Sequence, residues 1–307
     1  MTNAIDLSAI RRLYKDGVNV IDHLRKQLGT KLNTDELVET SYDMQAGSYV
    51  EYVEQHPDLC KPYQQEVAHI LDRLIRPGDS VVDVGTGEMT TLTPIAAVGY
   101  HKVAHAYALD ISLSRLLVGR KYARRMLTDV LAAKIQPVVA SLFQMPFADN
   151  SIDLLWTSHA LEPNGGRELD ALAELARVCC RHLVLCEPSY ENNSAEGRQR
   201  MDRLGYIKGL QEAVARVPGV ELVETLRIDA TENRLNPTYA HVIRKTSEAE
   251  RRSPALHCPL SRGPLEARAG YFYSKNSLLA YPVIEGVPVL RAEKGVSASF
   301  LDEGIGS

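Results

Sequence analysis

The fold is predicted most directly by one segment of the chain, Ser80-Val-Val-Asp-Val-Gly-Thr-Gly-Glu-Met-Thr90. A short β-branched apolar run leads into a glycine turn, and a helical pattern begins after the turn. Gly85 and Gly87 permit a tight turn and a close approach of the backbone to a ligand. This order of strand, turn and helix is typical of nucleotide-binding α/β proteins, although a purely structural turn has the same pattern.

Two details separate this turn from the dinucleotide fingerprint. Asp83 lies two residues before Gly85, where dinucleotide-binding proteins normally carry an apolar residue because the pyrophosphate is anionic. An acid there suits a ligand with positive charge, such as an amino-acid ammonium group beside a sulfonium. Thr90 stands in place of the third glycine, so the segment departs from the dinucleotide pattern.

Strand-like and helix-like segments alternate after this turn, which indicates a parallel sheet covered on both faces. Strands are predicted at 80–84, 103–109, 135–140, 152–156 and 182–186, and helices at 90–98, 114–131, 168–178 and 198–216. Segments 221–228 and 239–244 are expected to close the sheet as an antiparallel pair. The predicted fold class is α/β: a doubly wound, Rossmann-like, mainly parallel sheet with a helical N-terminal cap and a small C-terminal β-rich module.

The composition is that of an ordinary soluble globular protein, with 307 residues, 45% of them hydrophobic and 24% charged, and a formal net charge of -4. This balance excludes a protein whose whole surface binds nucleic acid. The five cysteines form no CxxC pair, so neither a disulfide framework nor a metal site is expected. The N-terminus lacks an apolar signal-peptide core, and no run approaches the roughly 18 apolar residues that span a bilayer. We therefore expect a cytoplasmic protein without membrane contact.

The second predicted strand ends in Leu109-Asp110-Ile-Ser, about twenty residues after the glycine turn. A carboxylate at this point can bind both hydroxyls of a ribose. Asp110 could instead cap the helix that follows, since Ser112 and Ser114 come directly after it. Its position relative to the glycine turn favours the ribose role.

Together these segments resemble the class I S-adenosylmethionine-dependent methyltransferases, whose first motif is an acid followed by GxGxG and whose second strand ends in an acid. Residues 81–90 and 108–111 carry this resemblance, with Met89 at the third glycine. Further segments extend it over 42–244. Tyr42-Asp-Met-Gln-Ala-Gly-Ser-Tyr49 resembles the tyrosine-rich segment that folds over the cofactor. Residues 140–154 resemble the loop after the third strand, and Trp156-Thr-Ser-His-Ala-Leu-Glu162 the fourth-strand motif.

The resemblance implies S-adenosylmethionine as the cofactor and S-adenosylhomocysteine as its product. It implies that the adenine lies against Ser141, which stands where the family usually has Asp, and against the backbone N–H of Leu142. The residues implied in cofactor binding are Tyr49, Asp83, Gly85, Thr86, Gly87, Asp110, Ile111, Ser141, Leu142 and Ser158. The corresponding division of the chain is a helical cap at 1–75, a catalytic domain that binds the cofactor at 76–246, and the small module at 247–307.

Methyl transfer is an in-line displacement, so the enzyme has to align the nucleophile and remove its proton where it carries one. Catalytic candidates belong at the carboxyl ends of the fourth and fifth strands, and we predict His159, Glu162 and Tyr190. His159 is the candidate general base, since its pKa lies near neutrality, or it simply packs in its loop. Glu162 either orients His159 or caps the helix at 168–178.

Other polar residues near these strand ends have two interpretations each. Glu187 and Tyr190 either contact the substrate or serve packing and capping. Three arginines after the fifth strand either hold an anionic group of the acceptor or form a solvated helix face; they are Arg198, Arg200 and Arg203. The basic run from Arg115 to Arg125 is interpreted as a solvated face.

The C-terminal region resembles the small zinc-ribbon-like proteins that bind and activate methyltransferases of tRNA and translation factors. The resemblance rests on Cys258-Pro-Leu-Ser261, Tyr281-Pro282 and Gly286-Val-Pro288. Ser261 occupies the second cysteine position and no cysteine follows it, so four thiolates for zinc are not available. The resemblance therefore implies this fold without its metal. Its role would be docking on the catalytic domain, subunit contact, substrate closure or stabilisation alone.

Three functions remain open at this point. The first is transfer of a methyl group to a small-molecule or saccharide acceptor, which the acidic chain and the helical cap favour. The second is an RNA or protein methyltransferase, which the activator-like module suggests but which needs a broad basic face. The third is a non-catalytic regulatory subunit that binds S-adenosylmethionine. Nucleic acid is not the expected partner, and a homo-oligomer is left open.

Overall fold

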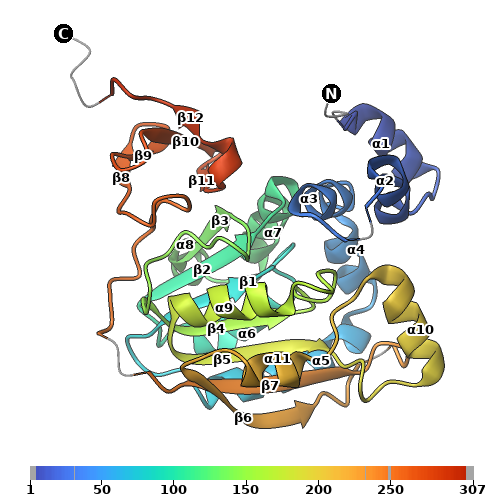
Figure 1. Ribbon diagram of the computed structural model, residues 1–307. Coiled ribbons are helices and arrows are strands. Elements are labelled where there is room, and N and C mark those ends of the chain that lie inside the picture. The colour runs from blue at the N-terminus through green and yellow to red at the C-terminus, as the bar shows by residue number, and fades with distance from the viewer. Residues whose placement is uncertain (1–4, 31, 232, 248–249, 302–307) are drawn as a thin grey trace.

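The computed structural model describes residues 5–30, 32–231, 233–247 and 250–301 (Figure 1). Within these ranges the central sheet has seven strands in the order β3-β2-β1-β4-β5-β7-β6. Their bounds are β1 Ser80–Val84, β2 His105–Asp110, β3 Ile135–Val139, β4 Ile152–Ser158, β5 Cys179–Pro188, β6 Val220–Arg227 and β7 Thr238–Lys245. β1 to β5 run parallel, and β7 lies antiparallel between β5 and β6. The predicted doubly wound, mainly parallel sheet and its antiparallel closing pair are confirmed.

The order of the parallel strands reverses between β1 and β4, and this switch positions the site. β1 pairs with β2 on one side and with β4 on the other. Ligands of open α/β sheets bind in the crevice at the carboxyl ends of the strands, at such a switch point. Gly85, Asp110 and Ser158 therefore come to one edge of the sheet from three different strands.

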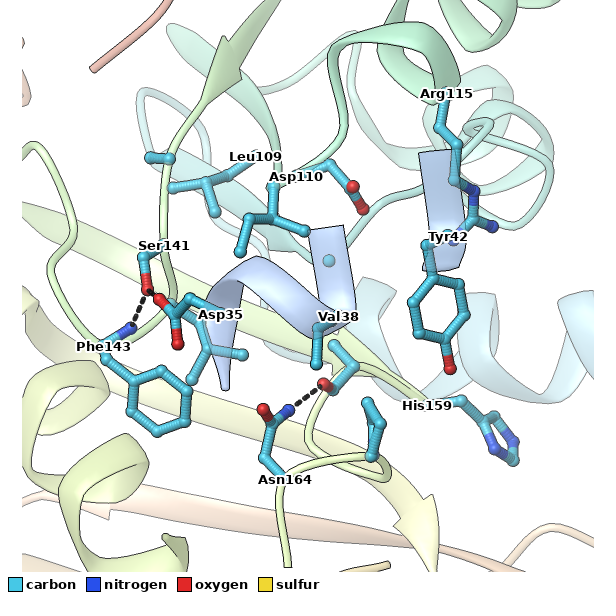
Figure 2. A pocket seen from close by; sticks show the side chains of 16 residues that line it. Asp35, Val38, Tyr42, Leu109, Asp110, Arg115, Ser141, Phe143, His159 and Asn164 are labelled. Carbon is cyan, nitrogen blue, oxygen red and sulfur yellow. Dashed lines mark hydrogen bonds between the residues drawn. The ribbon is translucent and has the colours of Figure 1, made fainter. Parts of the chain in front are cut away.

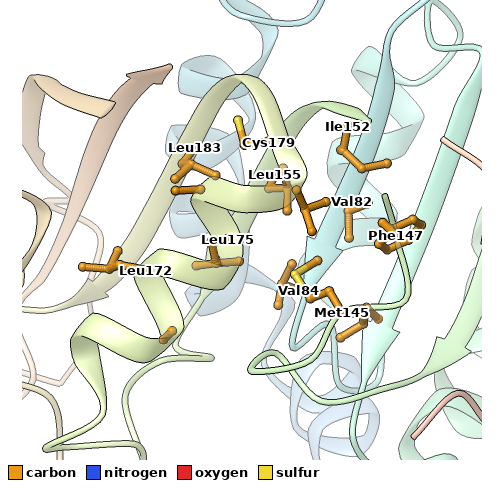
Figure 3. Packing of buried hydrophobic residues seen from close by; sticks show 14 of the residues in the cluster. Val82, Val84, Met145, Phe147, Ile152, Leu155, Leu172, Leu175, Cys179 and Leu183 are labelled. Carbon is orange, nitrogen blue, oxygen red and sulfur yellow. The ribbon is translucent and has the colours of Figure 1, made fainter. Parts of the chain in front are cut away.

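β1 is buried along its whole length because its alternating side chains face two cores. Val82 and Val84 pack with Phe147 and Leu175 on one face of the sheet (Figure 3). Val81 belongs to the core on the other face, which is covered by α5, α6 and α7. Burial on both faces explains why this strand is almost continuously apolar.

The helices around the sheet differ from the prediction at two places. They are α6 Leu92–Gly99, α7 Leu113–Met126, α8 Asp129–Lys134, α9 Glu168–Val178, α10 Ala195–Leu204 and α11 Leu210–Ala215. The single helix predicted over 114–131 is wrong, because Thr128 starts a new helix by accepting the Leu131 N–H through its Oγ1 at 3.4 Å. The helix predicted over 198–216 is also divided, since Gly205 and Gly209 adopt positive φ angles of 69° and 59°.

A helical cap precedes the sheet. Its helices are α1 Leu7–Lys15, α2 Val20–Leu28, α3 Asp35–Asp43, α4 Ser48–Gln55 and α5 Pro57–Asp72. The end of α3 is tied to the start of α7, because Asp43 accepts hydrogen bonds from the hydroxyls of Ser112 (2.6 Å) and Ser114 (2.9 Å). This contact holds the cap against the carboxyl edge of the sheet. Across the part of the chain described, no helix combines the length and apolar character needed to cross a membrane.

The C-terminal module is a small antiparallel sheet that docks on β3 (Figure 1). Its strands are β8 Glu266–Arg268, β9 Tyr271–Ser274, β10 Leu279–Ile284, β11 Val287–Pro288 and β12 Val296–Ser297, and η1 Ala292–Lys294 is a short 3-10 turn. The Leu290 N–H donates to the Val139 carbonyl at 2.8 Å, so the module adds backbone pairing to the edge of the main sheet. The segment between β7 and β8 includes residues 248 and 249, which lie outside the described ranges.

Candidate functional site

Two neighbouring cavities open at the carboxyl ends of β1, β2 and β4. The first has a volume of about 70 Å³ and lies between the sheet edge and α3 (Figure 2). The second has a volume of about 590 Å³ and is lined mainly from α4, α5, the turn after β1, the end of β4 and the segment before β7. The cavities share four lining residues, Tyr42, Gly85, Arg115 and His159. A ligand in one cavity would therefore meet a ligand in the other at these residues.

The glycine turn has the backbone shape that its residues predict. Gly85 has a φ of 75°, and a Cβ added to it would lie 2.3 Å from the Cβ of Ala160. The N–H groups of Gly85 and Thr86 donate to the Leu109 carbonyl at 2.7 and 3.0 Å. The turn thus folds against the end of β2, and a side chain at position 85 would collide with Ala160, so glycine is required there.

Asp83 lies beneath this turn and lines neither cavity. It is 2% exposed, and burial raises the pKa of its carboxyl to about 8. Gly87 also lines neither cavity, because the guanidinium of Arg115 covers it. These two predicted cofactor residues therefore support the turn in this structure, while Gly85 and Thr86 face the cavities.

Asp110 lies in the wall of the first cavity, next to Leu109 and Ile111. Its Oδ2 accepts the Gly87 N–H at 2.8 Å, and its Oδ1 accepts the Ser112 N–H at 2.9 Å. The helix that follows is capped by Ser112, whose side chain accepts the N–H of Arg115. Asp110 is therefore not the cap of α7, and each of its oxygens keeps a further lone pair for a ligand.

The far end of the first cavity is formed by the loop after β3 and by α3. Ser141, Leu142 and Phe143 line it, as does Asp35 from the start of α3 (Figure 2). The Ser141 hydroxyl donates to Asp35 Oδ2 at 2.5 Å, and Arg167 donates to Asp35 Oδ1 at 2.7 Å. Asp35 was not among the predicted site residues, because nothing in the local sequence of α3 indicates that its first turn reaches the sheet.

Arg115 was also missed, and the interpretation of it as part of a solvated face is wrong. Its side chain is 8% exposed and lines both cavities. The guanidinium carbon lies 4.5 Å from the centre of the Tyr49 ring and 5.3 Å from that of Tyr42. Its Nε is 3.8 Å from Glu88 Oε1, and within the described chain no hydrogen-bond partner reaches this Nε.

A sequence signal for Arg115 existed. The buried residues of α7 recur at helical spacing and include Arg115, Leu116, Gly119, Tyr122 and Ala123. Arg115 falls on the same face as Gly119, where an added Cβ would lie 2.6 Å from the backbone carbonyl carbon of Glu88. A cation on the glycine-containing face of a helix that follows a ligand-binding strand is a candidate for the site.

His159 and Glu162 form a hydrogen-bonded pair at the end of β4. His159 Nδ1 contacts Glu162 Oε2, and His159 Nε2 lies 3.1 Å from the Thr238 hydroxyl. Asn236 donates to the same Glu162 oxygen at 3.3 Å. Burial alone would lower the pKa of His159, but the Glu162 carboxylate raises it above 6.5. The pair faces the second cavity, and Glu162 orients His159 rather than capping the helix at 168–178.

Glu187 holds this loop in place from below. It is fully buried and accepts hydrogen bonds from the Thr157 hydroxyl (2.6 Å) and from the N–H groups of Ala160 and Glu162 (3.0 Å each). Burial raises the pKa of its carboxyl to about 7. The capping interpretation of Glu187 thus agrees with its contacts.

Tyr190 lies outside both cavities, and its hydroxyl donates to Asp202 at 3.2 Å. Arg198 and Arg203 are exposed on α10, in line with a solvated face. Arg200 on the same helix lines the second cavity, 5.4 Å from the centre of the Tyr206 ring. Of the three arginines, Arg200 is the one placed to meet a ligand.

The second cavity is rich in tyrosine. Tyr42, Tyr49, Tyr52, Tyr63 and Tyr206 line it, together with the predicted Ser158. The Tyr63 and Ser158 hydroxyls are 2.8 Å apart, so α5 of the cap contacts the end of β4 directly. Tyr63 and Tyr206 were not predicted, since they come from segments far from the recognised motifs. Metal-binding groups of three or more His, Cys, Asp or Glu side chains are absent from the described residues.

Comparison with known proteins places the match on the core of the sheet. Residues 82–184 match the model of a family described as methyltransferase domain. The demethylmenaquinone methyltransferase of Renibacterium salmoninarum is 38% identical over 102 residues, which is 33% of this chain and 37% of that protein. The same-named protein of Mycobacterium sp. (strain JLS) is 32% identical over 123 residues, 39% of this chain and 46% of that protein. The chain thus matches less than half the length of these curated relatives.

One solved structure extends the likeness in fold. The magnesium protoporphyrin IX methyltransferase of Synechocystis PCC 6803 with bound SAH superimposes with a TM-score of 0.52. The alignment covers 69% of this chain and 100% of that chain at 16% sequence identity. At this identity the likeness concerns the fold, and it agrees with the α/β sheet described above.

Proposed function

We propose that this chain is an S-adenosylmethionine-dependent methyltransferase that acts on a small-molecule acceptor. The observation that carries the proposal is the junction of the two cavities at Tyr42, Gly85, Arg115 and His159. Methyl transfer requires a donor and an acceptor aligned end to end, and two cavities that meet over a glycine turn provide this arrangement. The match of residues 82–184 to a methyltransferase domain supports the same reading.

The residues of the first cavity fit the cofactor. The apolar side chains of Leu109, Leu142 and Phe143 suit a flat base, and Asp110 has lone pairs free for two ribose hydroxyls. Arg115 has a buried Nε without a hydrogen-bond partner in the described chain, which suits the carboxylate of an amino-acid moiety. When bound, S-adenosylmethionine would supply an activated methyl group.

The second cavity is where the acceptor would bind. Its tyrosine rings and Arg200 suit a small molecule that is part apolar or ring-shaped and part anionic or hydroxylated, and a saccharide also fits this chemistry. Helices α4 and α5 of the cap wall the cavity, which favours a small acceptor over a nucleic acid strand. The curated relatives are named for a small-molecule acceptor as well.

His159 and Glu162 would serve an acceptor that carries a proton on its nucleophilic atom. Neutral His159 can take a proton at Nε2, provided that the acceptor replaces Thr238 as its partner. Glu162 fixes the ring and stabilises the charge that His159 then gains. No comparable role is proposed for Tyr190, whose hydroxyl faces Asp202.

The experiment that tests the proposal is a calorimetric titration with S-adenosylmethionine and S-adenosylhomocysteine. Wild type should bind both, and Asp110→Ala should lose most of the affinity because two charge-assisted hydrogen bonds disappear. Binding by wild type then justifies a screen of small acceptors for release of S-adenosylhomocysteine. A folded wild type that binds neither compound would refute the proposal. Cofactor binding without turnover on any acceptor would favour a non-catalytic regulatory subunit instead.

We further infer that the C-terminal module is a metal-free relative of a zinc ribbon. Two turns with the same spacing face each other, one from Cys258 to Ser261 and one from Ser274 to Ser277. The Ser261 and Ser274 hydroxyls are 3.3 Å apart, and Cys258 Sγ lies 3.4 Å from the Ser277 hydroxyl. In both turns the next residue has a positive φ of 56°, so the two turns share one backbone shape. Hydrogen bonds thus occupy the place where a ribbon holds a metal.

A further inference from the structure

The carboxylate of Asp35 is unusual because the cap supplies it to a cavity that the sheet otherwise builds. Asp35 is the first residue of α3, directly after the N-cap Thr34. Its side chain is 27% exposed and contributes to the wall of the first cavity. Figure 2 shows it beside Ser141 and Phe143, at the end of the cavity away from Arg115.

The hydrogen bonds around Asp35 determine what it can offer to a ligand. The Ser141 hydroxyl donates to Asp35 Oδ2, and it also accepts the Phe143 N–H at 3.2 Å. Arg167 donates to Asp35 Oδ1 and stacks on Phe143, with its guanidinium carbon 3.4 Å from the ring centre. The Ser141 hydroxyl proton is thus already used in a hydrogen bond, whereas each Asp35 oxygen retains a lone pair. The polar group that this end of the cavity presents is an acceptor.

We infer that Asp35 accepts a hydrogen bond from the exocyclic amine of the cofactor's purine and so makes the site specific for a 6-amino base. This inference rests on the proposed cofactor. Leu142 and Phe143 provide apolar walls for the ring, and a carboxylate at its edge attracts an amine and repels a 6-oxo group. The short Ser141 side chain leaves the space that the Asp35 carboxylate enters from α3.

The placement of Asp35 also links base recognition to the cap. α3 is fixed at its other end by Asp43, which binds Ser112 and Ser114 on α7. A purine amine held by Asp35 would therefore add a bond between ligand and cap rather than between ligand and sheet. Recognition of the base would therefore also stabilise the contact between the cap and the sheet.

The test compares S-adenosylhomocysteine with S-inosylhomocysteine, in which the 6-amino group is replaced by oxygen. Calorimetric dissociation constants are measured for wild type, for Asp35→Asn, and for the matched control Glu36→Gln. The control removes a carboxylate from the same helix turn at an exposed position. The ratio of the two constants is the readout, because any general weakening of the cap affects both ligands alike.

Wild type and Glu36→Gln should bind S-adenosylhomocysteine at least about 10-fold more tightly than the inosyl compound. In Asp35→Asn the ratio should fall to about 3-fold or less, since an amide can turn to donate to the 6-oxo group. The double variant Asp35→Ser, Ser141→Asp should regain preference for the amine by returning a carboxylate to the cavity. An unchanged ratio in Asp35→Asn would overturn the inference and leave the proposed function standing. Failure of wild type to bind either compound would overturn both.

Discussion

At Arg115 a buried cation lies near two tyrosine rings, with the Glu88 carboxylate 3.8 Å from its Nε. Such a cation is incompletely compensated in the free protein, so an anionic ligand group gains more from it than from a solvated arginine. Arg115→Met should therefore weaken S-adenosylhomocysteine binding by about 10- to 100-fold. Titration calorimetry gives the affinity, and Arg124→Met on the exposed face of α7 is the matched control. Equal affinity in the two variants would show that Arg115 does not contact the ligand.

The His159–Glu162 pair predicts the pH dependence of transfer to a hydroxyl acceptor. A protonated imidazole cannot accept a proton, so kcat/KM should rise with pH through the raised pKa of His159, above 6.5. Glu162→Gln removes the carboxylate that raises this pKa, so the rising limb should move to lower pH. His159→Asn should remove the limb, whereas Tyr190→Phe should retain it. The measurement is kcat/KM against pH with an acceptor from the screen, and a profile that is identical in wild type and His159→Asn would contradict the base role.

At the level of single residues, the sequence predicted most of the site residues that follow strands, together with Tyr49 from the cap, and missed others that come from elsewhere. Asp110, Ser141 and Ser158 lie in the cavity walls because their places depend on the strand pattern alone. Asp35 and Tyr63 face the cavities because of how the helices of the cap pack on the sheet, and no local sequence pattern predicts that packing. Asp83 lies near the carboxyl end of β1, as predicted, but its side chain is buried beneath the turn that follows.

Among the elements, α4 depends on a side chain from the glycine turn. Glu88 accepts the N–H groups of Gly47 (3.0 Å) and Val50 (2.8 Å), which are free donors at the start of this helix. Glu88→Ala should cost α4 about 1–3 kcal/mol of local stability. Hydrogen exchange of residues 47–55 should then accelerate, while β1 is unchanged. Glu51→Ala, at an exposed position of α4, is the control. Equal acceleration throughout the sheet would argue against a local capping role.

The facing turns of the C-terminal module make a prediction about metals. Replacing Ser261, Ser274 and Ser277 by cysteine would place four thiols where one thiol and three hydroxyls now hydrogen-bond. This variant should bind one equivalent of zinc, and cobalt substitution should give the absorption of a tetrahedral thiolate site. The same variant with Cys258→Ala has three thiols and should bind much more weakly. Absence of stoichiometric metal in the four-thiol protein would show that the turns do not have ribbon geometry.

For the whole molecule, the strand alternation and the glycine turn were sufficient to predict the layered sheet and its antiparallel closing pair. The breaks in the helices at 127–128 and 205–209 were missed, because the helical periodicity continues across them. Their signals are Thr128 as a cap and two glycines with positive φ. The strand on which the module docks, β3, could not be predicted either, because backbone pairing between distant segments does not depend on a local pattern of side chains.

The pairing of Leu290 with Val139 has a consequence for the behaviour of the protein in concentrated solution. An uncovered edge strand is a template on which another molecule can add a strand, and aggregation starts at such edges. Here the backbone of residues 289 and 290 pairs with part of the β3 edge, so this part of the edge is not accessible to other molecules. We therefore expect the module to contribute to colloidal stability. Molecules from which it is displaced should associate through that edge as their concentration rises.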